Sequence, residues 1–182
     1  IHQQWKDADF VVQEQTFMDR GQTFRNIITT LGPPQAPTIV IGAHYDVCGE
    51  QPGADDNASA VAGLLELSKR IKKHAPILKK HIEFVAYTLE EPPYFATELM
   101  GSAVHARSLK AKEIEVTAMI SLEMLGYFDD QKNSQNYPIS FMSLWYPNRG
   151  NFIAVVGDQS KAGRQITRKI RSGMERGGSL PV

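Results

Sequence analysis

Runs of apolar residues divide the chain into expected strands and helices. Residues 10–17 and 23–31 are rich in β-forming side chains, and the turn-like segment Met18-Asp19-Arg20-Gly21 between them predicts a hairpin. Residues 38–43 form a continuous apolar run, which is typical of a strand buried on both faces. The sheet is therefore expected to begin with a hairpin and to continue with a fully buried strand.

Residues 58–73 carry apolar side chains at nearly helical spacing, so we predict a helix there, with Asp56 or Asn57 where an N-cap belongs. The same reasoning predicts further strands at 81–88, 116–122, 139–145 and 152–156, and further helices at 97–109 and 159–174. Strands that alternate with helices predict an α/β fold, with a mostly parallel central sheet flanked by helices on both faces.

The composition suits one globular domain, because 42% of the 182 residues are hydrophobic and 22% are charged. We predict a single catalytic domain over residues 1–182. The chain lacks an initiator methionine and ends in the loop-like residues 177–182, so we expect the domain to be incomplete at both ends. Its single cysteine, Cys48, excludes an internal disulfide.

The charge balance bears on the possible partners. Twenty basic residues offset twenty acidic ones, so neither nucleic acid nor an anionic membrane is an expected partner. The apolar runs are also too short to span a bilayer. The basic stretch at residues 161–176 reads as the solvated face of a helix rather than a site for an acidic partner.

Acidic and imidazole side chains follow three of the predicted strands. His44, Asp46, Asp55 and Asp56 follow the first, Glu90 and Glu91 the second, and Glu123 the third. Ligands bind outside the carboxyl ends of strands in open α/β sheets, and carboxylates gathered there repel one another unless cations neutralise them. A histidine among carboxylates suits zinc, so a zinc site is expected at this edge.

The local pattern resembles the zinc-dependent aminopeptidase family, which includes secreted bacterial two-zinc aminopeptidases, glutamate carboxypeptidase II and glutaminyl cyclase. The resemblance covers about residues 10–156 and rests on four motifs in the same order, namely Gly42-Ala43-His44-Tyr45-Asp46, Pro52-Gly53-Ala54-Asp55-Asp56-Asn57-Ala58-Ser59, Glu90-Glu91, and Ser121-Leu122-Glu123-Met124-Leu125-Gly126. Each motif alone would be weak, but four in order on the expected elements are specific.

The resemblance implies a role for each matched residue. His44 and Glu123 are expected to bind a first zinc, with Asp46 holding the His44 ring. Asp56 is expected to bridge two zincs, and Glu91 to bind the second. Glu123 stands where the family usually has an aspartate, which leaves the metal geometry at that position open.

The implied reaction is hydrolysis of N-terminal residues from peptides by a zinc-activated water, with Glu90 as general base. The family completes its second zinc site with a histidine far downstream, yet no histidine follows Glu123 here. We expect this histidine in a longer parent protein; a relative that has lost full metal binding is the alternative.

Simpler interpretations remain for single residues. Taken alone, His44 could be a core histidine, Asp55 and Asp56 capping residues, and Glu90 with Glu91 a solvated turn. Cys48 is more simply an inert thiol than a ligand. Tyr94 and Phe95 suit either a substrate pocket or the core, and the remaining histidines near basic residues are expected on the surface: His74, His81 and His105.

Two other functions compete with peptide hydrolysis. One is acyl transfer of the glutaminyl cyclase type, which uses one zinc, and the other is a non-catalytic receptor or scaffold role. Carboxypeptidase specificity is a variant of the leading hypothesis. The resemblance also implies a secreted or periplasmic location and a peptide substrate, whereas the oligomeric state stays open.

Overall fold

The structure is a computed structural model that describes residues 1–74, 77–137, 146–178 and 181–182. The chain divides into two compact units, Ile1–Gly126 and Tyr127–Val182. All three strand ends with predicted chemistry belong to the first unit. The single catalytic domain over residues 1–182 stays a prediction.

The first unit is built on a five-stranded sheet with strand order β1-β2-β4-β3-β5. In chain order its strands are β1 (Val12–Asp19), β2 (Gln22–Leu31), β3 (Thr38–His44), β4 (His81–Tyr87) and β5 (Val116–Ser121). β1 and β2 pair antiparallel, as do β2 and β4, whereas β3 pairs parallel with both β4 and β5. The predicted α/β fold is confirmed, and the sheet is mixed, with its antiparallel strands at one edge.

The expected hairpin is present, and its tight turn has a local cause. Arg20 and Gly21 both have positive φ, at 47° and 81°, between the paired residues Asp19 and Gln22. A two-residue loop with positive φ at both positions matches the right-handed twist of the flanking strands. The turn therefore fixes the register of β1 on β2.

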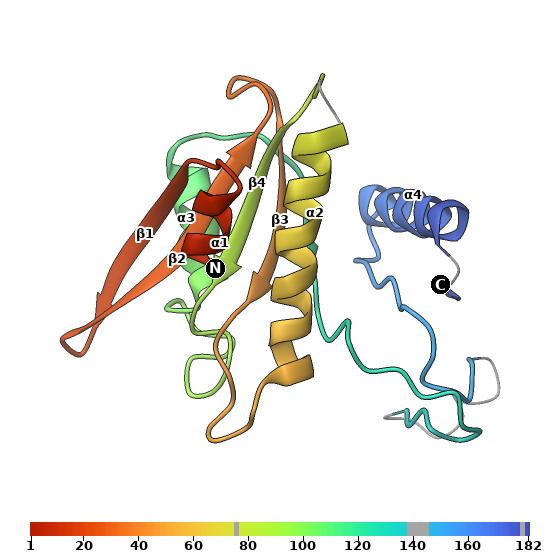
Figure 1. Ribbon diagram of the computed structural model, residues 1–182. Helices are drawn as coiled ribbons and strands as arrows, with labels where there is room; N and C mark the ends of the chain where they lie inside the picture. Colours follow the sequence, from red (N-terminus) through yellow and green to blue (C-terminus); the bar gives the residue numbers. More distant parts are fainter. Residues whose placement is uncertain (75–76, 138–145, 179–180) are drawn as a thin grey trace. The chain divides into compact units, whose positions relative to one another are not determined.

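Side chains alternate between two cores along the central strands. Phe84 of β4 faces a core that includes Trp5 and Leu64, whereas the next residue, Val85, faces a second core with Val40. Helix α2 (Ala60–His74) covers the first face of the sheet, and α3 (Gly101–Ala111) lies on the other (Figure 1). Because both faces are covered, β3 is a nearly continuous apolar run, and β4 is apolar apart from His81 and Glu83.

A short helix at the start of the chain, α1 (His2–Asp7), was not predicted. Its Trp5 is fully buried, and the indole Nε1 donates a hydrogen bond of 2.9 Å to Oγ of Ser68 in α2. Burial of the large ring with its single donor satisfied anchors α1 to the first core.

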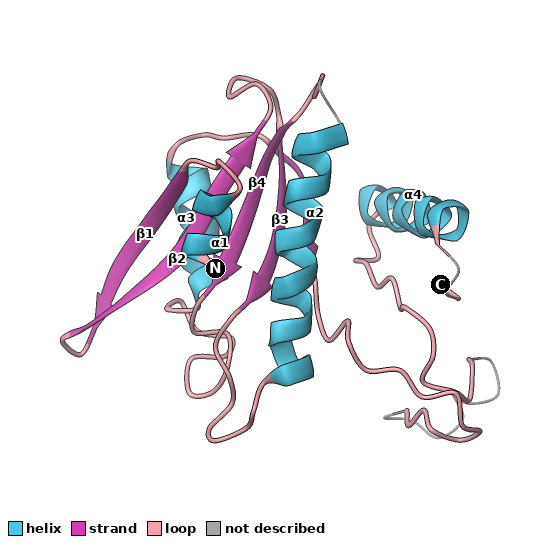
Figure 2. Ribbon diagram, in the orientation of Figure 1, coloured by secondary structure: helices cyan, strands magenta, loops and turns pink. Residues whose placement is uncertain are grey.

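The second unit contains α4 (Lys161–Gly177), drawn in Figure 2 as the helix that follows a long loop. Ser160 caps it, because its Oγ accepts a hydrogen bond of 2.9 Å from the backbone nitrogen of Gly163. Its basic side chains are exposed, as expected for a solvated face. The strand predicted at 152–156 is wrong, since the structure has irregular backbone there, and the strand predicted at 139–145 lies outside the described residues.

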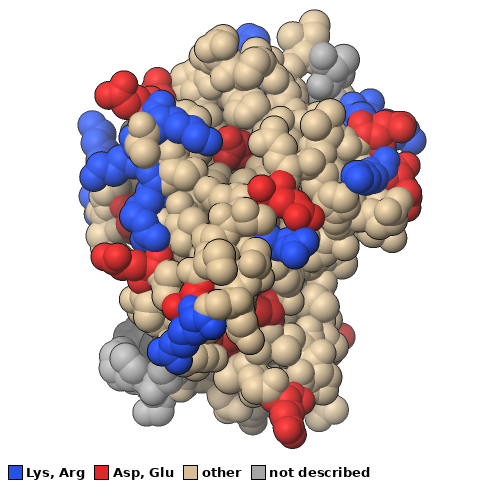
Figure 3. All heavy atoms as spheres, turned by 90° about the vertical axis from the view of Figure 1, so that its left-hand side faces the viewer, with Lys and Arg blue, Asp and Glu red and all other residues tan. Residues whose placement is uncertain are grey.

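Among the described residues, no helix is both long enough and apolar enough to cross a membrane. Viewed from the left-hand side of Figure 1, basic and acidic side chains are interspersed on the surface (Figure 3). This face therefore offers a mixed field rather than one dominated by a single sign.

Candidate metal centre

The carboxyl ends of β3, β4 and β5 lie side by side because β3 is the middle strand of the three. His44 is the last residue of β3 and pairs with Tyr87, the last residue of β4. The backbone nitrogen of Leu122, just beyond β5, donates a hydrogen bond of 2.8 Å to the carbonyl of Gly42. The sheet thus delivers the segments that contain His44, Glu90 and Glu123 to one edge.

His44 is the centre of the group, and its side chain is 4% exposed. Its Nε2 atom lies 3.2 Å from Oδ1 of Asp56, 3.3 Å from Oε1 of Glu123 and 3.9 Å from Oε2 of Glu90. One ring nitrogen therefore faces three carboxylates that come from three different loops.

The other ring nitrogen of His44 faces Asp46. Nδ1 lies 3.1 Å from the backbone carbonyl oxygen of Asp46 and 3.6 Å from its Oδ1. The second carboxylate oxygen, Oδ2, accepts a hydrogen bond of 3.0 Å from the backbone nitrogen of Glu91. Asp46 therefore contacts both the His44 ring and the loop after β4.

The loop before α2 places Asp56 in the group. Gly53 begins an irregular helical turn, η1 (Ala54–Ser59), with φ of 65°, and a Cβ there would collide with the Val47 side chain. Only glycine combines this left-handed backbone with such a close approach. The turn brings ligand atoms of His44, Asp56 and Glu91 within 4.8 Å of one another.

The pKa values reflect this crowding of charges. Burial lowers the pKa of His44, but the hydrogen bond to Asp46 and the charges of Glu123 and Glu90 outweigh it, raising the pKa to about 9. Burial raises the pKa of Glu90 and that of Glu123, and neighbouring carboxylates add to both effects. Without a bound cation, the neighbouring carboxylates thus favour the protonated form of His44.

The donor set fits zinc. It contains one imidazole nitrogen and several carboxylate oxygens, which are zinc's usual ligands besides thiolate. Oδ1 of Asp56 is buried without a hydrogen-bond partner among the described residues, as expected of an oxygen whose partner is an ion. His44, Asp56 and Glu91 form a group that could hold a metal ion.

The structure also involves residues that the sequence analysis missed. Asn57 was considered only as a possible helix cap, yet its side chain reaches Leu122, Glu123 and Met124. Its position directly after Asp56 was the available signal. Asp55 is not a simple loop residue either, because its Oδ1 accepts a hydrogen bond of 2.8 Å from the backbone nitrogen of Gly126.

The two aromatic residues after the paired glutamates lie in different environments. Tyr94 donates a hydrogen bond of 2.8 Å to Oδ2 of Asp19 at the hairpin turn, and its ring packs 5.8 Å from that of Phe24. Phe95 is 59% exposed. Tyr94 thus links this loop to the hairpin, whereas the Phe95 side chain is exposed at the surface.

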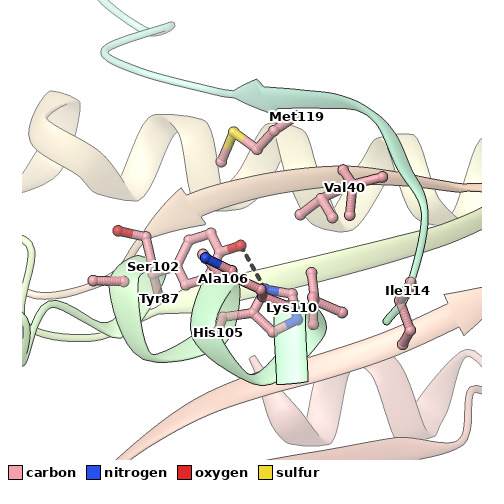
Figure 4. Close-up of a pocket in the computed structure, with 11 residues that line it drawn as sticks. Val40, Tyr87, Ser102, His105, Ala106, Lys110, Ile114 and Met119 are labelled. Carbon is pink, nitrogen blue, oxygen red and sulfur yellow. Dashed lines mark hydrogen bonds between the residues drawn. The ribbon is translucent and has the colours of Figure 1, made fainter. Parts of the chain in front are cut away.

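A separate hollow of about 670 Å³ lies between α3 and β5, and it includes none of the six predicted site residues. Its lining includes Tyr87, whose hydroxyl is 2.9 Å from Nδ1 of His105 (Figure 4).

The surface location expected for His105 is wrong: the residue is 3% exposed, and its Nε2 lies 3.0 Å from Oε2 of Glu83. His81 is also partly buried, whereas His74 is exposed as expected.

A family model described as peptidase family M28 matches residues 26–162, which contain all six predicted site residues. The chain belongs to peptidase family M28. The chain is 47% identical over 165 residues to the uncharacterized protein YfbL of Escherichia coli, an alignment that covers 85% of this chain and 50% of YfbL. The chain thus spans about half the length of this relative.

Two solved structures share this fold. The LapA aminopeptidase of Legionella pneumophila matches with 27% identity and a TM-score of 0.57, over 70% of this chain and 34% of that one. The glutaminyl cyclase of Porphyromonas gingivalis matches with 25% identity and a TM-score of 0.59, over 72% of this chain and 50% of that one. Both activities named from the resemblance therefore occur among proteins with this fold.

Proposed function

We propose that the full-length protein is a zinc-dependent aminopeptidase that removes N-terminal residues from peptides. The observation that carries the proposal is the arrangement around His44, where one buried ring nitrogen faces Asp56, Glu123 and Glu90. Membership of peptidase family M28 supports a peptidase activity with peptide substrates.

Two zinc ions are proposed for the full-length protein. His44, Asp56 and Glu123 hold the first, while Asp56 and Glu91 contribute to the second, which needs one more ligand than the described residues supply. When bound, zinc supplies Lewis acidity to the scissile carbonyl and acidifies water. The backbone carbonyl of Asp46, 3.1 Å from Nδ1 of His44, and the Asp46 carboxylate, 3.6 Å away, orient the ring so that Nε2 faces Asp56 and Glu123.

Glu90 is proposed as the general base. Its carboxylate lies beside the metal ligands without contacting the His44 ring closely, at 3.9 Å. Burial raises its pKa, which moves it toward the range where a carboxylate accepts and releases protons efficiently. Glu90 takes a proton from the attacking water and gives it to the leaving amine nitrogen.

Cyclisation of N-terminal glutamine is the second candidate, because the P. gingivalis glutaminyl cyclase shares this fold. That activity would need one zinc. The set of His44, Asp56 and Glu123, in which Nε2 lies 3.2 and 3.3 Å from the two carboxylates, supports a two-metal site and hence the aminopeptidase.

Zinc stoichiometry and substrate turnover test the proposal together. Native mass spectrometry of the full-length protein should show two zincs, and the protein should release N-terminal residues from short peptides. One zinc with cyclisation of N-terminal glutamine would establish the second candidate instead. Absence of zinc would favour a non-catalytic relative, and cleavage at the other peptide end would show a carboxypeptidase.

The proposed location follows from the resemblance alone. A secreted or periplasmic enzyme is the proposal consistent with the secreted bacterial aminopeptidases of the family. Fractionation of cells that express the full-length gene would test it.

A further inference from the structure

The segment after β5 is fastened to the loop before α2 by side chains far away in sequence. Asn57 is 1% exposed, and its Nδ2 donates hydrogen bonds to the carbonyl of Leu122 at 3.1 Å and to Oε2 of Glu123 at 3.2 Å. Its Oδ1 accepts a hydrogen bond of 3.0 Å from the backbone nitrogen of Met124. Both donors and the acceptor of this buried amide are therefore used.

Two further links lie beside it. Oγ of Ser59 accepts a hydrogen bond of 2.9 Å from the backbone nitrogen of Leu125, and Oδ1 of Asp55 accepts one of 2.8 Å from that of Gly126. The two segments approach so closely that a Cβ on Gly126 would lie 2.8 Å from Cβ of Ser59. We call the side chains of Asp55, Asn57 and Ser59 with residues 122–126 the clip.

Within the clip, Asn57 alone contacts a predicted metal ligand. Glu123 is half exposed, and freezing its long side chain costs up to about 2 kcal/mol of conformational entropy. Asn57 holds Oε2 of Glu123, while Oε1 of Glu123 lies 3.3 Å from Nε2 of His44. One carboxylate oxygen is thus held by the amide, and the other is directed to the metal centre.

We infer that Asn57 is a positioning residue that sets the carboxylate of Glu123 for metal binding, an inference that rests on the proposed function. Because Asn57 directly follows Asp56, the same short turn presents one ligand and orients another. Glu123 has one methylene more than the aspartate usual at this position of the family, and Asn57 restricts that additional rotation. The amide acts through Glu123 and does not touch the ion.

Zinc affinity of the full-length protein, measured by competition with a chromophoric chelator, tests this role. Asn57→Ala should weaken binding about 10- to 100-fold, as loss of a partner behind a metal ligand typically does. Ser59→Ala is the matched control, because it removes another link of the clip without touching Glu123. Its affinity should stay within about threefold of the parent's.

A double-mutant cycle of Asn57→Ala with Glu123→Ala separates an effect on the position of Glu123 from a general loss of stability. In that background Asn57→Ala should change zinc affinity less than about threefold, whereas urea unfolding in chelator should show a loss of stability in both backgrounds. Asn57→Asp serves if the alanine variant does not fold, because it keeps the acceptor for Met124 and loses both donors. It should weaken zinc binding at least as much.

Equal losses for Asn57→Ala and Ser59→Ala, or an undiminished loss without the Glu123 carboxylate, would overturn the inference and leave the aminopeptidase proposal intact. A parent protein that binds no zinc would instead reject the proposed function itself. The two failures are therefore distinguishable in one set of titrations.

Discussion

The carboxylate of Asp46 accepts a hydrogen bond of 3.0 Å from the backbone nitrogen of Glu91, and so joins the loop after β3 to the loop after β4. Its other oxygen lies 3.6 Å from Nδ1 of His44. The burial of Asp46 raises its pKa, but the bonds to His44 and to the loop outweigh this and lower it. Asp46 is therefore ionised at neutral pH and stabilises both a ligand and the neighbour of the proposed base.

Replacing Asp46 by alanine should weaken zinc binding about 10- to 100-fold, because the His44 ring loses the partner that orients it. Competition titration of the full-length protein measures this effect. Glu50→Gln, an exposed residue of the same loop, is the control and should bind as the parent does. Unchanged affinity for Asp46→Ala would show that the backbone alone fixes the ring.

Replacing Glu90 by glutamine in the full-length protein should retain zinc and reduce kcat about 10²- to 10⁴-fold, the usual contribution of a general base. Zinc content and peptide turnover are measured on the same sample. The control is Glu98→Gln, an exposed glutamate of the same loop. Activity close to the parent's would exclude Glu90 as the base.

The metal-free protein should lose stability as the pH rises through about 9. The folded-state pKa of His44 is raised from 6.5 to about 9, so its contribution is fully present below pH 6.5 and is lost above the folded value. Urea midpoints in chelator at pH 6 and at pH 9.5 measure this loss. His44→Gln should show a smaller difference between the midpoints at the two pH values, whereas the exposed control His74→Gln should show the parent's difference. A His44→Gln profile that matches the parent's would mean that another group causes the loss of stability.

Removing the Tyr87 hydroxyl should destabilise the first unit by about 1–3 kcal/mol, because Nδ1 of His105 is then buried without its partner. Urea unfolding of Tyr87→Phe measures it. Tyr45→Phe, whose hydroxyl bonds to the carbonyl of Arg25 in a more exposed setting, is the control and should cost less. Zinc affinity should be unchanged, since the His105 network lies among the residues that line the separate hollow.

Much of the fold could be predicted from the sequence, because period-two and continuous apolar runs report directly on strand burial. Thr38–His44 and His81–Tyr87 are strands within one residue of the predicted bounds. The run at 152–156 has the same β-forming composition but lies in irregular backbone. A β-forming composition shows only that a segment can be a strand. Whether it becomes one depends on a partner strand, which the local sequence does not contain.

His105 illustrates a limit of reading residues by their sequence neighbours. Arg107 nearby suggested a solvated position, yet Gly101, His105 and Leu109 are spaced by four and form the buried stripe of α3. The helical period would have placed His105 in the interior. Its partner, Glu83, lies on another element, and no local pattern indicates that pairing.

The metal centre was predictable as a set of residues but not as a geometry. The four motifs indicated which carboxylates collect, because the carboxyl ends of adjacent parallel strands share an edge. They did not indicate that Asn57 would reach Glu123 or that Asp46 would reach Glu91, since each contact joins loops separated by tens of residues.

The strand order of the sheet also bears on the order in which its strand pairs form during folding. The β1–β2 hairpin closes through a two-residue turn, whereas β3 must wait for β4 and β5, which enter the sequence tens of residues later. Pairing between strands that are far apart in sequence generally forms more slowly than local pairing. The ligand cluster therefore forms only when these late, long-range pairings are complete, so capture of the metal would report the last step of folding rather than the first.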